Sequence, residues 1–149
     1  MSDSLQELYQ EVILDHNRRP RNFRAIEGGD RQEGYNPLCG DRVTVYMTIE
    51  NGVVTDVAFE GVGCAIAKAS ASLMTEALRG LSVDQARERF RRFQAMVTSA
   101  HDAPAPELGK LSVLAGVREF PTRVKCASLA WHAARAVLDG APAAPVSTE

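Results

Sequence analysis

The sequence has no excess of charge of one sign and no long run of apolar residues. Its 149 residues carry 17 Lys and Arg against 19 Asp and Glu, a net charge of −2 at pH 7. This balance gives no electrostatic basis for binding nucleic acid or an anionic membrane. No stretch approaches the roughly 20 apolar residues of a transmembrane helix. The first residues, MSDSLQELYQ, are acidic where a secretion signal is basic and then apolar. We therefore expect a cytoplasmic protein that binds neither nucleic acid nor membranes.

Cysteine is also scarce, since the chain contains only Cys39, Cys64 and Cys126 and no Cys-x-x-Cys pair. An odd number of widely spaced cysteines, with no secretion signal, argues against a disulfide framework. The long separations are not those of a zinc finger either. Three thiols in a reducing compartment are then core residues, metal ligands or catalytic groups, and their spacing alone does not decide among these.

The pattern of apolar residues predicts a small antiparallel sheet. Apolar and polar residues alternate over 43–50 and again over 53–59, with Asn51-Gly52 between them. This combination is typical of two antiparallel strands joined by a tight turn. A further short strand is expected before Tyr35.

Helical spacing of apolar residues predicts helices around this sheet. Ser82 and Gln85 form a capping box for one of them, and Pro121 suits the first turn of another. We expect helices over about residues 4–16, 65–78, 82–99, 108–116 and 121–140. The prediction is an α+β fold with the helices on one face of the sheet. It comprises a single domain over 1–140 and a disordered tail over 141–149.

Each cysteine is expected at the end of an element. Cys39 lies in the turn NPLCGD immediately before a strand, two residues before Asp41. Cys64 opens a helix, where unpaired N–H groups and the helix dipole favour a thiolate, and Cys126 lies in the early turns of the last helix. Ends of elements can meet on one side of a sheet. Three thiolates and the Asp41 carboxylate would then be a complete tetrahedral ligand set for Zn²⁺.

The charges near the third cysteine suit such a site. Three thiolates and a carboxylate around Zn²⁺ leave a net charge of −2, which is costly to bury. Arg123 and Lys125 are placed next to Cys126 and are the natural compensating cations. Three unrelated buried thiols remain the alternative at this point.

The histidines are interpreted as structural or solvated rather than as ligands. His16 ends the first helix, where a cation suits the dipole. His101 is expected in a polar loop, and His132 is expected as a structural residue in the middle of the last helix.

Four segments of the chain resemble the U-type iron–sulfur assembly proteins, which share the NifU N-terminal-like fold. These segments are ILDHNRRPRN, NPLCGD, GVGCAIAKASASLMT and FPTRVKCASLAW, and the resemblance covers about residues 5–138. Two features make the chain most similar to the SufU branch of the SUF system. Lys125 stands before the third cysteine, where general scaffold members have histidine, and residues 82–110 resemble the insertion typical of SufU proteins.

The resemblance implies a function and a role for each site residue. It implies that Cys39, Asp41, Cys64 and Cys126 hold Zn²⁺, that Cys39 accepts sulfur, and that Arg123 contacts the site. The implied activity is that of a zinc-dependent sulfurtransferase for iron–sulfur cluster assembly. Its sulfur donor would be a SufS-type PLP-dependent cysteine desulfurase, and a downstream SUF scaffold would receive the sulfur. Two alternatives remain: a scaffold that assembles a [2Fe–2S] cluster with iron on the same ligands, and a non-catalytic zinc docking module.

Overall fold

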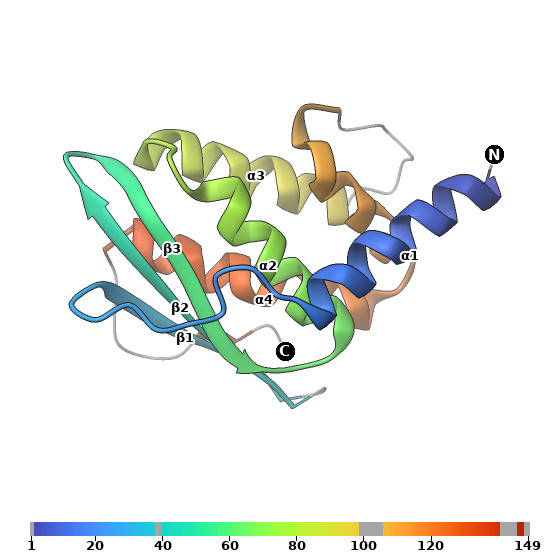
Figure 1. Ribbon diagram of the computed structural model, residues 1–149, viewed down its shortest axis with the longest axis horizontal. Helices are drawn as coiled ribbons and strands as arrows, with labels where there is room; N and C mark the ends of the chain where they lie inside the picture. The colour runs from blue at the N-terminus through green and yellow to red at the C-terminus, as the bar shows by residue number, and fades with distance from the viewer. Residues whose placement is uncertain (1, 38–39, 99–105, 141–145, 148–149) are drawn as a thin grey trace.

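The computed structural model of the chain describes residues 2–37, 40–98, 106–140 and 146–147. Helices and strands follow one another along the chain as shown in Figure 1. In chain order they are α1 (Ser2–Arg18), β1 (Asp30–Asn36), β2 (Asp41–Glu50), β3 (Val53–Val62), α2 (Ala65–Leu78), α3 (Val83–Thr98), the 3₁₀ helix η1 (Pro106–Glu119), α4 (Pro121–Leu138) and β4 (Val146–Ser147). The predicted α+β fold is therefore confirmed.

The sheet has the strand order β3-β2-β1-β4. β2 and β3 form the predicted antiparallel hairpin, and both residues of its turn, Asn51 and Gly52, have positive φ (52° and 77°). Such a turn matches the right-handed twist of the strands. β1 pairs antiparallel with β2 from Asp30 opposite Met47 to Asn36 opposite Asp41. This pairing places the start of β2 at the sheet end where β1 finishes.

The end of the chain adds a short strand to the free edge of β1. Val146 and Ser147 pair in parallel with Gly34 and Tyr35. The expectation of a disordered tail over 141–149 is therefore wrong for these two residues, because β1 offers them an open row of backbone groups. The remainder of that segment lies outside the described residues.

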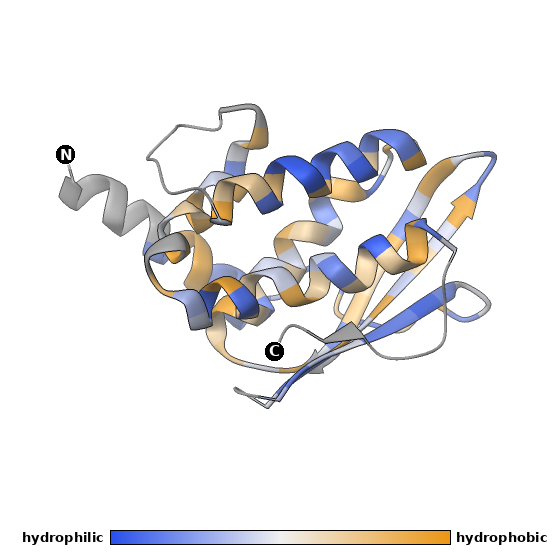
Figure 2. Cartoon of the chain, turned by 180° about the vertical axis from the view of Figure 1, so that it is seen from behind, coloured by the Kyte–Doolittle hydropathy of each residue, from blue (hydrophilic) through white to orange (hydrophobic). Residues whose placement is uncertain are grey.

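The helices cover one face of the sheet in two successive layers (Figure 1). α4 packs on β1 and β2, and α2 packs on β3 and against α4. α1, α3 and η1 pack on these two helices rather than on the centre of the sheet. Figure 2 shows the outer helix α3 as largely hydrophilic, with separate hydrophobic positions along it. Those positions are buried and face inward: Ala86, Phe90, Phe93, Met96 and Val97.

Helix ends follow the local sequence signals. α2 has the predicted bounds, and α3 begins after Ser82, whose hydroxyl accepts from the Gln85 N–H while the Gln85 side chain accepts from the Ser82 N–H (3.1 and 3.0 Å). η1 is longer than expected and is a 3₁₀ helix with a non-helical residue at Gly109. Its buried residues recur every three positions, which is the 3₁₀ period: Leu108, Leu111, Leu114 and Val117. Within the described residues, no helix has the length and apolarity needed to cross a bilayer.

Candidate metal centre

Three of the four predicted ligands meet at one end of the sheet. Asp41 is the first residue of β2, Cys64 caps α2, and Cys126 lies in the second turn of α4. One carboxylate oxygen of Asp41 and the two Sγ atoms all lie within 4.8 Å of one another. The three elements therefore bring together side chains that are 23 and 62 residues apart in the sequence.

Cys64 is the N-cap residue of α2 and forms hydrogen bonds to α2 and to β2. Its backbone is extended (φ −68°, ψ 170°), and its Sγ accepts a hydrogen bond from the N–H of Ala67 at 3.4 Å. Its own N–H donates to Oδ1 of Asp41 at 3.0 Å. The thiol is exposed and stands at a helix N-terminus, where the unpaired N–H groups favour a negative charge.

Asp41 is a buried carboxylate with one unused oxygen. Its exposed fraction is 1%, and within the described part of the chain Oδ2 has no hydrogen-bond partner. Burying an unpaired carboxylate oxygen is costly, so the position favours a cation next to it. Two thiols and a carboxylate at this separation are a donor set that Zn²⁺ prefers. The residues present therefore fit a bound metal ion.

The residues on either side of the connection from β1 to β2, which contains Cys39, are joined by backbone contacts. Asn36 pairs with Asp41, and the N–H of Gly40 donates to the Asn36 carbonyl at 2.9 Å. Gly40 has φ +72°, a conformation that favours glycine. The predicted turn before the strand is thus present at its described ends. Cys39 itself lies outside the described residues, so its place as a ligand stays a prediction.

The predicted compensating cations flank the third cysteine but do not pair with the carboxylate. Arg123 is exposed, and its guanidinium lies over the ring of Phe120, 5.7 Å from the centroid. Lys125 is half-buried. In the part of the chain that the structure describes, neither residue forms an ion pair with Asp41. Any contact of Arg123 with the site therefore stays a prediction.

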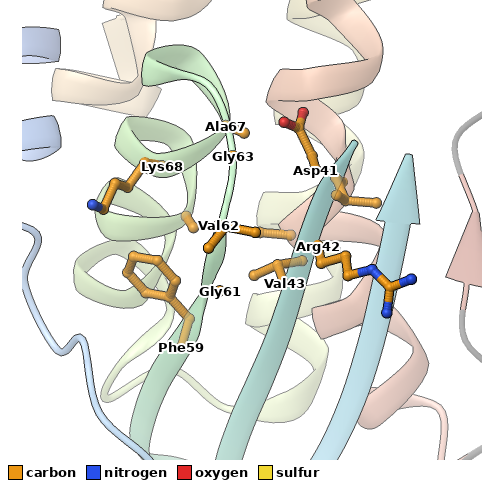
Figure 3. A pocket seen from close by; sticks show the side chains of 12 residues that line it. Asp41, Arg42, Val43, Phe59, Gly61, Val62, Gly63, Ala67 and Lys68 are labelled. Carbon is orange, nitrogen blue, oxygen red and sulfur yellow. The ribbon is translucent and has the colours of Figure 1, made fainter. Parts of the chain in front are cut away.

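Two other cations, which the sequence analysis did not single out, line a pocket next to Asp41. A pocket beside Asp41 is lined by Arg42 and Lys68 together with apolar residues such as Phe59 and Val62 (Figure 3). Figure 3 shows the Asp41 carboxylate near Gly63 and the Arg42 side chain pointing away from it. Each cation lies over an aromatic ring, Arg42 over Tyr35 at 4.8 Å and Lys68 over Phe23 at 5.4 Å. Lys68 could have been found from its position one helical turn after Cys64.

The described histidines lie apart from this group of three ligands. His16 is 1% exposed, and its Nδ1 lies 2.7 Å from Oγ of Ser72 on α2. Burial is the main cause that lowers the pKa of His16 below its ordinary value, and Arg21 adds to the decrease. The interpretation of His16 as a cation at a helix end is therefore wrong, because α2 covers it. Burial also lowers the pKa of His132, whose ring packs edge-on against Phe90; His101 lies outside the described residues.

These features define a class of protein, a small α+β domain with a carboxylate and two thiols gathered where a strand and two helices begin. The model of the NifU-like N terminal domain family matches residues 8–127, and the chain belongs to this family. The resemblance to U-type iron–sulfur assembly proteins is thereby confirmed.

Relatives of known name cover most of the chain. It is 38% identical to the zinc-dependent sulfurtransferase SufU of Bacillus subtilis over 130 residues. These residues cover 87% of this chain and 88% of that protein. It is also 38% identical over 129 residues to the iron–sulfur cluster assembly scaffold protein IscU of Streptococcus pyogenes, 87% and 81% of the two chains. A crystal structure of an iron–sulfur cluster assembly scaffold protein for the SUF system from Fervidobacterium islandicum superposes with a TM-score of 0.78 at 32% identity, covering 89% and 96% of the two chains.

Proposed function

We propose that this protein is a zinc-dependent sulfurtransferase that accepts persulfide sulfur for iron–sulfur cluster assembly. The observation that carries the proposal is the group formed by Asp41, Cys64 and Cys126. Its ligand atoms lie within 4.8 Å of one another, and one carboxylate oxygen has no hydrogen-bond partner among the described residues. The similarity to a zinc-dependent sulfurtransferase over 87% of the chain supports the same assignment.

Four residues would hold the metal ion in this proposal. Asp41, Cys64 and Cys126 supply three ligands, and Cys39, two residues before Asp41, supplies the fourth. Bound Zn²⁺ would keep the thiols deprotonated at neutral pH. Cys64 and Cys126 are held by α2 and α4. Cys39 belongs instead to the connection between β1 and β2, which makes it the thiol best suited to react.

The proposed reaction is a thiol–disulfide type of exchange. The Cys39 thiolate attacks the terminal sulfur of a donor persulfide, and the sulfur–sulfur bond of the donor breaks. The donor cysteine leaves as a thiolate, and Cys39 becomes the persulfide, so no external oxidant or reductant is consumed. Arg123, exposed at the start of α4, would stabilise the negative charge that moves during the transfer.

The donor in this proposal is a PLP-dependent cysteine desulfurase of the SufS type, and a SUF scaffold receives the sulfur. We place the reaction in the cytoplasm, where cysteine thiols stay reduced. The relatives named as iron–sulfur cluster assembly scaffold proteins support iron–sulfur cluster assembly as the process that this transfer serves.

The test measures metal content and desulfurase stimulation together. Protein purified without added metal should contain about one Zn²⁺ per chain and should increase the turnover of the desulfurase. Cys39→Ala should abolish the stimulation, while Ser128→Ala, a change of similar size in α4, should leave it unchanged. A folded Cys39→Ala variant that stimulates fully would refute the role of Cys39 and would favour a non-catalytic docking module.

The second candidate function is a scaffold that assembles a [2Fe–2S] cluster on the same ligands. A relative of equal identity, 38%, is named as a scaffold protein, and thiolates bind both kinds of centre. Anaerobic reconstitution with iron and sulfide separates the two functions. A stable cluster that moves to an apo-ferredoxin would favour the scaffold, and a colourless protein that retains Zn²⁺ would favour the sulfurtransferase.

A further inference from the structure

A buried polar bridge joins α2 to α4 next to the metal centre. The hydroxyl of Ser70 donates to the carbonyl oxygen of Ala127 at 2.6 Å. The same hydroxyl oxygen accepts from the indole N–H of Trp131 at 3.1 Å. Ser70 and Trp131 are both fully buried, so water does not compete for these two hydrogen bonds.

The bridge connects the two helices that carry the described thiols. Ser70 lies six residues after Cys64, less than two turns along α2. Ala127 directly follows Cys126 in α4. A slide or rotation of one helix against the other would therefore change the spacing of the two Sγ atoms and break the bridge at the same time.

The third helix of this arrangement belongs to the segment 82–110. Phe93 of α3 stacks on Trp131 with ring centroids 4.2 Å apart and an angle of 9° between the planes. Both rings are fully buried. This stack fixes the orientation of the indole ring and hence the direction in which its N–H points.

We propose that Ser70 and Trp131 are positioning residues of the metal centre, which fix α2 against α4 and thereby set the spacing of Cys64 and Cys126. Phe93 supports them from α3, which gives this helix of the segment 82–110 a role at a site to which its described residues contribute no ligand. The inference rests on the metal site of the proposed function. Apolar packing alone would hold the two helices together, but it is not directional. The two hydrogen bonds supply the direction, because they weaken steeply when the groups are misaligned.

The test compares metal affinity in matched variants of the full chain. Ser70→Ala removes the bridge, and Trp131→Phe removes the indole N–H while keeping an aromatic ring against Phe93. Ser128→Ala is the control. Ser128, in α4, is buried like Ser70, but its Oγ has no hydrogen-bond partner among the described residues. Zn²⁺ affinity is measured by competition with a chromophoric chelator, and the Co²⁺ absorption spectrum reports the ligand geometry.

We expect Ser70→Ala and Trp131→Phe each to weaken Zn²⁺ binding about tenfold, the lower end of the effect of supporting residues at metal sites. Their Co²⁺ spectra should shift, and the double variant should lose less than the product of the single losses, since both changes remove the hydrogen bond between Trp131 and Ser70. Ser128→Ala should stay within about twofold of wild type.

The outcomes separate this inference from the proposed function. If wild type binds Zn²⁺ and Ser70→Ala binds it as tightly as Ser128→Ala, the positioning role is wrong and the metal site stands. If wild type binds no metal, the proposed function fails at its site and the inference fails with it. If Ser70→Ala does not fold by circular dichroism, Trp131→Phe decides, since it leaves the bond from Ser70 to Ala127 in place.

Discussion

The backbone N–H of Cys64 donates a 3.0 Å hydrogen bond to Oδ1 of Asp41, so the cap of α2 is tied to the first residue of β2. This bond uses one carboxylate oxygen for structure and leaves the other, Oδ2, buried without a hydrogen-bond partner in the described part of the chain. One side chain therefore aligns two elements and also offers a ligand atom. Changes at Asp41 should separate these two effects.

The first prediction concerns how fast the metal is lost. Asp41→Ala removes a ligand and the acceptor for the Cys64 N–H, so we expect zinc to pass to a chelator at least about tenfold faster than from wild type. Stopped-flow measurement with a chromophoric chelator gives the rate. Asp84→Ala is the control, because Asp84 is 95% exposed on α3. Equal rates for Asp41→Ala and wild type would remove Asp41 from the ligand set.

The second prediction concerns the metal-free protein, in which removing the charge of Asp41 should raise the unfolding free energy instead of lowering it. The buried carboxylate of Asp41 then forms no ion pair within the described part of the chain. Asp41→Asn keeps an acceptor for the Cys64 N–H and removes the charge, so we expect the unfolding free energy of the metal-free chain to rise by about 1–3 kcal/mol. The metal-bound chain should lose stability with the same change. Urea unfolding with excess chelator and with excess Zn²⁺ measures both, and a loss of stability in both conditions would contradict the prediction.

Periodicity and turn chemistry predicted most of the fold. The alternation around Asn51-Gly52 predicted the hairpin, and the helical spacing of apolar residues predicted α2 with its observed bounds. β4 was missed because its two residues, Val146 and Ser147, depend on the open edge of β1 and carry no local pattern.

The site was predictable as a set of residue types at element ends, but its surroundings were not. The sequence indicated Asp41, Cys64 and Cys126, and these three meet in the structure. The burial of His16 depends on how α1 packs on α2, and the place of Arg42 in the pocket depends on how β2, β3 and α2 lie together. These are tertiary relationships between distant segments, which the spacing of residues within one segment does not contain.

The third prediction concerns the pH dependence of stability through His16. Burial is the main cause that lowers the pKa of His16, and Arg21 and Lys110 lower it further, whereas Glu76 on α2 and Asp15 oppose the decrease. The folded state thus binds fewer protons than the unfolded state, and the unfolding free energy rises with pH. This contribution is fully present above the ordinary pKa of about 6.5 and is lost as the pH falls through that value toward the lowered pKa of the folded state.

Urea unfolding between pH 5 and 8, with chelator present, measures this effect. The slope from one histidine is at most about 1.4 kcal/mol per pH unit. We expect His16→Gln to flatten the slope below pH 6.5 and to cost stability at pH 7.5, since the buried hydrogen bond between the His16 ring and Ser72 is lost. His132→Gln serves as the comparison, because burial lowers the pKa of His132 as well and its removal should flatten the slope independently. An unchanged slope in both variants would show that folding does not lower the pKa of either ring.

The fourth prediction concerns Gly61, which lets β3 approach β2 just before Cys64. A Cβ atom there would overlap the carbonyl oxygen of Arg42 and lie 2.8 Å from Cα of Val43. Since these are backbone atoms, the strand must move, and we expect Gly61→Ala to cost about 2–3 kcal/mol of unfolding free energy. The displacement should also carry Cys64 away from Asp41 and weaken Zn²⁺ binding.

Gly52→Ala is the matched control for this change. Gly52 also has positive φ, but a Cβ there meets nothing within 4 Å, so only backbone strain of about 1–2 kcal/mol is expected. Its turn lies at the far end of β3 from Cys64, and its zinc affinity should stay that of wild type. Unfolding and chelator competition on both variants separate general instability from a displaced ligand. If both variants lose stability equally and bind Zn²⁺ equally, the close approach at Gly61 does not position Cys64.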